Sequence, residues 1–214
     1  MPESLDPLDP GWDAPVPLDD GDATASAPRS LPGFVTASLV GGYRWIEQRL
    51  FELLGGWAAE ATSPELRVHL DAQSARHAWH ASLWADRLPV RDGVSADELT
   101  VAPAVAAWVL AVLDGSRSEP TPLMAGLYRV VLPRLVTGYT RHLEDSAPVS
   151  DAPVIRALHL VLTDEIEDWH AGERLVQRLL TRPDDVAAVS ALHLKLESAL
   201  VEAGTGAGLT GWPV

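Results

Sequence analysis

Two histidines stand three residues apart in a segment of the chain that reads QSARHAWHASLW, from Gln73 to Trp84. Apolar residues recur at spacings of three and four on both sides of His77 and His80, which predicts a helix from near Pro64 to about Leu88. Neutral imidazole is a common metal ligand, and it is also found hydrogen-bonded inside helical cores. The pair therefore predicts either a metal site or a polar core.

Further metal-ligand candidates stand in two other predicted helices. Glu47 lies in a helix predicted for 34–61. Folding this helix back against the next one brings Glu47 level with the two histidines, and its side chain could meet them if it rotates inward. Glu165 lies within the apolar stripe of a helix predicted for 152–180, and His170 lies towards the edge of that stripe. Carboxylate and imidazole together suit iron or manganese, and a vacant coordination position would allow oxygen chemistry.

Arg134 argues against a metal ion. It borders the inward stripe of a helix predicted from Pro122 to His142, and the register of the next turn places it one helical turn from the level of Glu165. A fixed positive charge there would pair with Glu165 and oppose a divalent cation. We therefore expect an ion pair between the two residues.

The chain as a whole predicts an all-α protein. Ser63 followed by Pro64 is typical of a helix start, and almost no alternating pattern suggests strands. Helices are expected over about 34–61, 64–88, 102–114, 122–142, 152–180 and 184–203. The expected organisation is an acidic, proline-rich tail over 1–32, a helical bundle over 33–203 and a glycine-rich tail over 204–214.

Composition excludes several classes of function. The formal net charge of -14 disfavours nucleic-acid binding and docking on anionic membranes, and the absence of cysteine excludes thiolate sites. Neither a signal peptide nor a membrane span is recognised, so we expect a cytoplasmic protein.

The helix order resembles the ferritin-like superfamily of di-iron carboxylate proteins. Two helical hairpins are joined by a crossover that contains its own short helix, and LTDEIEDWHAGERLVQRLL resembles the family's fourth helix. The resemblance covers about 34–181 and implies a four-helix bundle with Glu on helices one and three and Glu-x-x-His on helices two and four. Helix two departs from this pattern, since Ser74 stands three residues before His77. Helix three offers Arg134 instead of Glu, and Glu167, in the one literal Glu-x-x-His, is out of phase with the core.

Two functional hypotheses place a site inside the bundle, and a third is a non-catalytic interaction module that uses the acidic tail over 1–32 and the outward Trp45 and Trp79. The first is a decayed di-iron site without a cofactor, kept as a polar pocket that binds a small molecule or serves an accessory role; its residues are Gln73, His77, His80, Arg134 and Glu165. The alternative is an oxidase or oxygenase that uses two metal ions or one, iron or manganese; its ligands are Glu47, His77, Glu165 and His170.

Three tryptophans are expected away from the core, at positions 45, 79 and 108. Exposed indoles of this kind predict a homodimer interface, or else cover by the crossover or the last helix.

Overall fold

The structure is a computed structural model, and it describes residues 31–90, 92–115, 120–202 and 208–212. Within these ranges the chain is all-α, as the sequence predicts. The expected tail over 1–32 lies outside the described residues, apart from Leu31 and Pro32. The helices are α1 (Gly33–Glu60), α2 (Pro64–Ala85), α3 (Ala96–Leu99), α4 (Ala104–Asp114), α5 (Pro120–Gly126), a π-helix (Leu127–Val131), α6 (Leu132–Glu144), α7 (Ala152–Leu179) and α8 (Pro183–Glu202).

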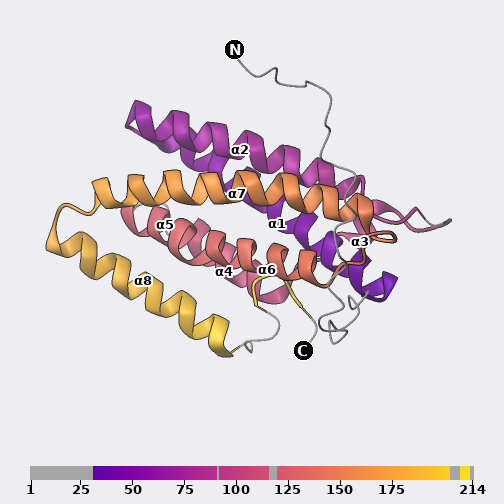
Figure 1. Cartoon of the computed structure of the whole chain (residues 1–214). Helices are drawn as coiled ribbons and strands as arrows, with labels where there is room; N and C mark the ends of the chain where they lie inside the picture. The colour runs from indigo at the N-terminus through magenta and orange to yellow at the C-terminus, as the bar shows by residue number, and fades with distance from the viewer. Residues whose placement is uncertain (1–30, 91, 116–119, 203–207, 213–214) are drawn as a thin grey trace, which may run out of the picture.

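The α1–α2 hairpin forms where the sequence predicts it. The Ser63 side chain accepts a hydrogen bond from the Leu66 backbone N–H at 3.4 Å, and Pro64 occupies the first turn of α2. Only three residues separate α1 from α2, so the two helices pack antiparallel along most of their length (Figure 1).

The third long helical segment, α5 to α6, is interrupted by the π-helix. Pro133 has no N–H to donate to the carbonyl of Arg129, and the helix widens just before it. This turn holds Tyr128, whose ring lies against Gly172 of α7. A Cβ atom on Gly172 would lie 2.1 Å from that ring, so the glycine makes room for the tyrosine.

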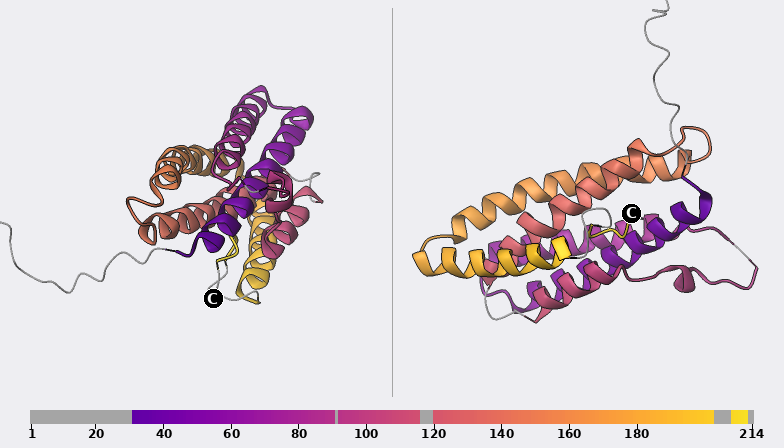
Figure 2. Two further views of the ribbon diagram at one scale, coloured as in Figure 1. Left: turned by 90° about the vertical axis from the view of Figure 1, so that its right-hand side faces the viewer. Right: turned by 90° about the horizontal axis from the view of Figure 1, so that it is seen from below.

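Helix α7 lies between α2 on one side and the α5–α6 segment on the other (Figure 1). Its buried positions follow a helical period from Val154 to Val176 and include Glu165 and Asp168. Helix α8 packs outside, against α5 and α4 (Figure 2). The more specific expectation of a ferritin-like four-helix bundle stays a prediction.

The C-terminal residues differ from the tail expected over 204–214. Leu209 and Trp212 are 1% and 4% exposed, and Arg141 stacks over the Trp212 ring with its Cζ 4.4 Å from the centroid. Gly138 has no side chain, which lets this segment pack closely against α6. A Cβ atom at this position would lie 2.6 Å from the side chain of Thr210. Residues 208–212 are therefore part of the packed structure.

The three tryptophans expected outside the core are exposed to different degrees. Trp79 and Trp108 are 44% and 41% exposed, whereas Trp45 is partly buried against the core. The homodimer stays a prediction. In the described part of the chain, no helix combines the length and the apolar character needed to cross a bilayer.

Candidate metal centre

Four buried side chains bring potential metal-binding atoms together inside the molecule. Glu47 comes from α1, His77 and His80 from α2, and Glu165 from α7. One ligand atom from each lies within 4.8 Å of the other three, and all four residues are 0% exposed. The sequence singled out every one of these residues, although it placed Glu47 on a flank of its helix and left His80 outside the proposed metal set.

Helical phase brings these side chains together. His77 and His80 are three residues apart and therefore share one side of α2. Glu47 lies beside the buried positions Ile46 and Leu50 of α1, and Glu165 lies in the buried stripe of α7.

The distances within the cluster show how its atoms converge. The Nδ1 atom of His77 lies 2.6 Å from Oε2 of Glu47 and 3.4 Å from Oε1 of Glu165. The Nδ1 atom of His80 lies 3.5 Å and 3.3 Å from the same two oxygens. Both imidazoles therefore present Nδ1 to the same pair of carboxylates.

Several atoms of the cluster have no hydrogen-bond partner among the described residues. They are both carboxylate oxygens of Glu165, Nδ1 of His80 and Nε2 of His77. A buried carboxylate without hydrogen bonds is costly, and a cation between the two Nδ1 atoms and the two carboxylates would satisfy it. Two carboxylates and two neutral imidazoles would also balance the charge of one divalent ion.

The electrostatics of the ion-free cluster favour protonated histidines. Burial alone would lower the pKa of His80, but Glu47 and Glu165 outweigh it and raise that pKa to about 11. The pKa of His77 is also raised, because Glu165 and Glu47 together outweigh burial. Burial opposes ionisation of Glu47, yet the two imidazoles lower its pKa to about 2. Protons thus hold the positive charge that a metal ion would bring.

Two residues outside the cluster contact its ligands. The Tyr139 hydroxyl of α6 donates a hydrogen bond to Oε1 of Glu47 at 2.6 Å. Nε2 of His80 lies 3.1 Å from Oδ2 of Asp164 and donates to it. Sequence reasoning missed both residues. Tyr139 follows the buried Leu135 by four positions, a spacing that could have revealed it.

A second polar layer lies one helical turn away along α2. Gln73 accepts a hydrogen bond from the Tyr128 hydroxyl, and the amide of Gln73 donates to the backbone carbonyl of Asp168 at 3.5 Å. His69 Nε2 lies 2.8 Å from the Tyr128 hydroxyl, and Arg76 pairs with the Asp168 carboxylate at 3.0 Å. Gln73, expected in the central pocket, therefore belongs to this neighbouring layer.

Arg134 does not lie beside Glu165, so the predicted ion pair is wrong. Its guanidinium forms an ion pair with Glu197 of α8, and it also donates to the backbone carbonyl of Val130 at 3.3 Å. The Arg134 side chain is 30% exposed and that of Glu197 is 28% exposed. A border position on a helix can face either neighbour, and α8 occupies the side that Arg134 faces.

His170 also lies away from the cluster. It is exposed and lines a shallow depression with Arg76, Glu167 and Arg174. The metal set predicted with His170 is therefore corrected, because His80 stands with the other three residues instead. Glu167 is exposed, as its helical phase predicted.

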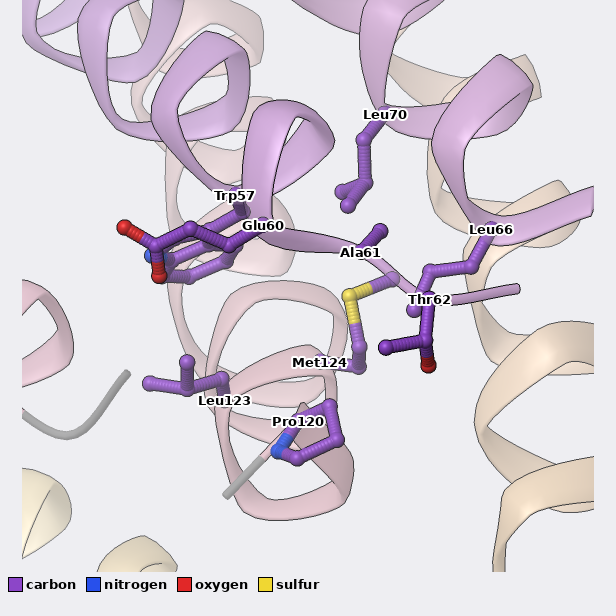
Figure 3. Close-up of a pocket in the computed structure, with 9 residues that line it drawn as sticks. All are labelled: Trp57, Glu60, Ala61, Thr62, Leu66, Leu70, Pro120, Leu123 and Met124. Atoms are coloured by element: carbon purple, nitrogen blue, oxygen red, sulfur yellow. The ribbon is translucent and has the colours of Figure 1, made fainter. Parts of the chain in front are cut away.

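A cavity of about 310 Å³ lies at the end of the molecule where α1 turns into α2 (Figure 3). Its lining is mostly apolar and consists of Trp57, Glu60, Ala61, Thr62, Leu66, Leu70, Pro120, Leu123 and Met124. None of the four clustered residues lines it. Leu70, which lines this cavity, precedes His77 in α2 by two helical turns, or about 10 Å along the helix axis. The cavity therefore lies apart from the four clustered residues.

Comparison with known proteins finds no matching family model, no similar curated protein and no similar solved structure.

Proposed function

We propose that this protein binds one divalent transition-metal ion, iron or manganese, at a buried site. Its ligands are Glu47, His77, His80 and Glu165. The observation that carries the proposal is the convergence of their ligand atoms within 4.8 Å, together with the buried oxygens of Glu165, which accept no hydrogen bond from the described residues.

The donor set supports this choice of metal. Magnesium and calcium prefer all-oxygen sites, whereas two imidazoles with two carboxylates suit iron or manganese. A second ion would need a further carboxylate ligand nearby. Asp168, in the neighbouring polar layer, is already paired with the guanidinium of Arg76, so we propose a single ion.

The contrary hypothesis, a decayed site that serves as a polar core, depended on Arg134 as the partner of Glu165. Because Arg134 pairs with Glu197, Glu165 has no guanidinium to balance its charge. Only the two imidazoles face Glu165 at ion-pair distance among the described residues, and they would serve equally well as metal ligands.

The activity that such a site supports best is oxidation that uses a small oxidant. Four protein ligands leave coordination positions open on iron or manganese, which favour six. All four ligands are fully buried, so the molecule that reaches the ion must be as small as dioxygen or hydrogen peroxide. The bound ion would supply electron transfer from a reduced organic substrate to that oxidant, and so would return to its starting oxidation state.

Metal analysis of the protein purified without chelators tests the proposal. We expect about one equivalent of iron or manganese, retained in Glu167→Gln and lost in Glu165→Gln. The first variant is a matched control, because Glu167 is an exposed carboxylate on the same helix. Equal metal content in both variants, or no binding of added Fe(II) or Mn(II) by the unaltered chain, would refute the site.

Peroxide or dioxygen consumption by the loaded protein, with ascorbate added as the electron donor, tests the activity separately. Consumption should follow metal content across the unaltered chain, Glu167→Gln and Glu165→Gln. A fully loaded protein that consumes neither oxidant would leave a metal-binding role and exclude the oxidase.

A further inference from the structure

Two of the four proposed ligands, Glu47 and His80, use their second polar atom for a contact with a residue outside the cluster. Glu47 turns Oε2 towards His77, while its other oxygen, Oε1, accepts the Tyr139 hydroxyl at 2.6 Å. His80 turns Nδ1 towards the two carboxylates, while its Nε2 lies 3.1 Å from Asp164.

We propose that Tyr139 and Asp164 are positioning residues, which aim Glu47 and His80 at the metal ion before it binds. This inference rests on the proposed function. A carboxylate held at one oxygen presents the other to the ion. An imidazole that donates from Nε2 to a carboxylate keeps that proton, so the incoming ion displaces the proton on Nδ1 and coordinates there.

The surroundings of Tyr139 make it a rigid support. Its ring is fully buried, meets Tyr43 edge-on with 4.8 Å between centroids, and lies 5.6 Å from the ring of Trp84. This packing fixes the hydroxyl at the site. Helix α6 gives no ligand to the cluster, but the hydroxyl of its Tyr139 holds the ligand Glu47.

Asp164 performs the same task from a different position. It directly precedes Glu165 on α7, so one helix supplies both a ligand and the support of a second ligand from α2. The Asp164 side chain is 25% exposed, so replacing it by Asn leaves little buried structure disturbed.

Loss of either support disturbs its ligand in a different way. In Tyr139→Phe, Glu47 can turn both oxygens towards the ion. In Asp164→Asn, the amide can present its NH₂ group to Nε2 of His80, which favours the proton on Nδ1 and removes the lone pair that the ion needs. Both changes alter the geometry around the ion as well as its affinity.

The test compares Mn(II) affinity and the visible spectrum of bound Co(II) in four variants. We expect the dissociation constant for Mn(II) to rise by about 10–100-fold in Tyr139→Phe and Asp164→Asn, the usual effect of losing such a support. The Co(II) absorption bands should shift in both. Tyr43→Phe and Glu167→Gln are the controls and should match the unaltered chain. Tyr43 is a buried tyrosine in contact with Tyr139, and no hydrogen bond joins its hydroxyl to any of the four proposed ligands in the described structure.

The outcomes separate this inference from the metal site itself. If the unaltered chain binds Mn(II) and both variants bind it as tightly with an unchanged Co(II) spectrum, the positioning role is overturned and the site stands. If the unaltered chain binds neither ion, both proposals fall together. Should Tyr139→Phe fail to fold, Asp164→Asn carries the test alone.

Discussion

Proton release on metal binding follows directly from the electrostatics of the cluster. At pH 7 the His80 imidazole, with a pKa raised to about 11 by Glu47 and Glu165 against the effect of burial, carries one proton that a metal ion must displace. The raised pKa of His77 adds part or all of a second proton. Glu47, with a pKa of about 2, is already ionised and releases none. We therefore expect about one to two protons released per ion bound.

Titration calorimetry with Mn(II) in buffers of different ionisation enthalpy measures this number. The apparent enthalpy should change linearly with the buffer enthalpy, with a slope equal to the protons released. The affinity for Mn(II) should rise with pH, by about 10–100-fold per unit near neutrality, because the ion competes with the displaced protons.

The same shifts set the sign of the pH dependence of the ion-free protein. A folded pKa above the unfolded value means that the contribution of His80 to stability is complete below about pH 6.5 and is lost as the pH rises towards 11. Chemical denaturation of the chelator-treated chain should show this alkaline loss, and bound Mn(II) should reverse it. Binding of Mn(II) with no proton release would refute the reasoning, since it would mean that both histidines are neutral in the ion-free protein.

Three further predictions concern stability. Gly172→Ala should destabilise the fold by about 1–3 kcal/mol in urea denaturation, because its Cβ would lie 2.1 Å from the Tyr128 ring; an unchanged midpoint would contradict the close packing. Arg134→Met should cost less than about 1 kcal/mol in the same assay, because its ion pair with Glu197 is partly exposed, and a loss of several kcal/mol would exclude that pairing. Burial lowers the pKa of His142 to about 4, so stability should fall by up to about 3 kcal/mol as the pH drops from 6.5 to 4. His142→Phe should flatten that part of the stability curve.

The cluster could be predicted from the sequence to the extent that its helices are regular. Helices α1, α2 and α7 keep an uninterrupted α-helical period, so counting residues places Glu47, His77, His80 and Glu165 on or beside buried faces. The short link around Ser63 also fixes how α1 and α2 align. Local rules were sufficient for these residues because each lies on a face that is buried whichever helices cover it.

Arg134 shows where such reasoning fails. Its position on the border of the apolar stripe was assigned correctly, but a border residue can turn towards either adjacent helix. The choice depends on α8, which returns to pack beside the α5–α6 segment after a turn that no local pattern orients. Pairing with Glu197 keeps the guanidinium partly hydrated, whereas pairing with Glu165 would have required full burial of both charges. The lower desolvation cost therefore favours the outer partner, and it leaves the two imidazoles as the groups that face Glu165.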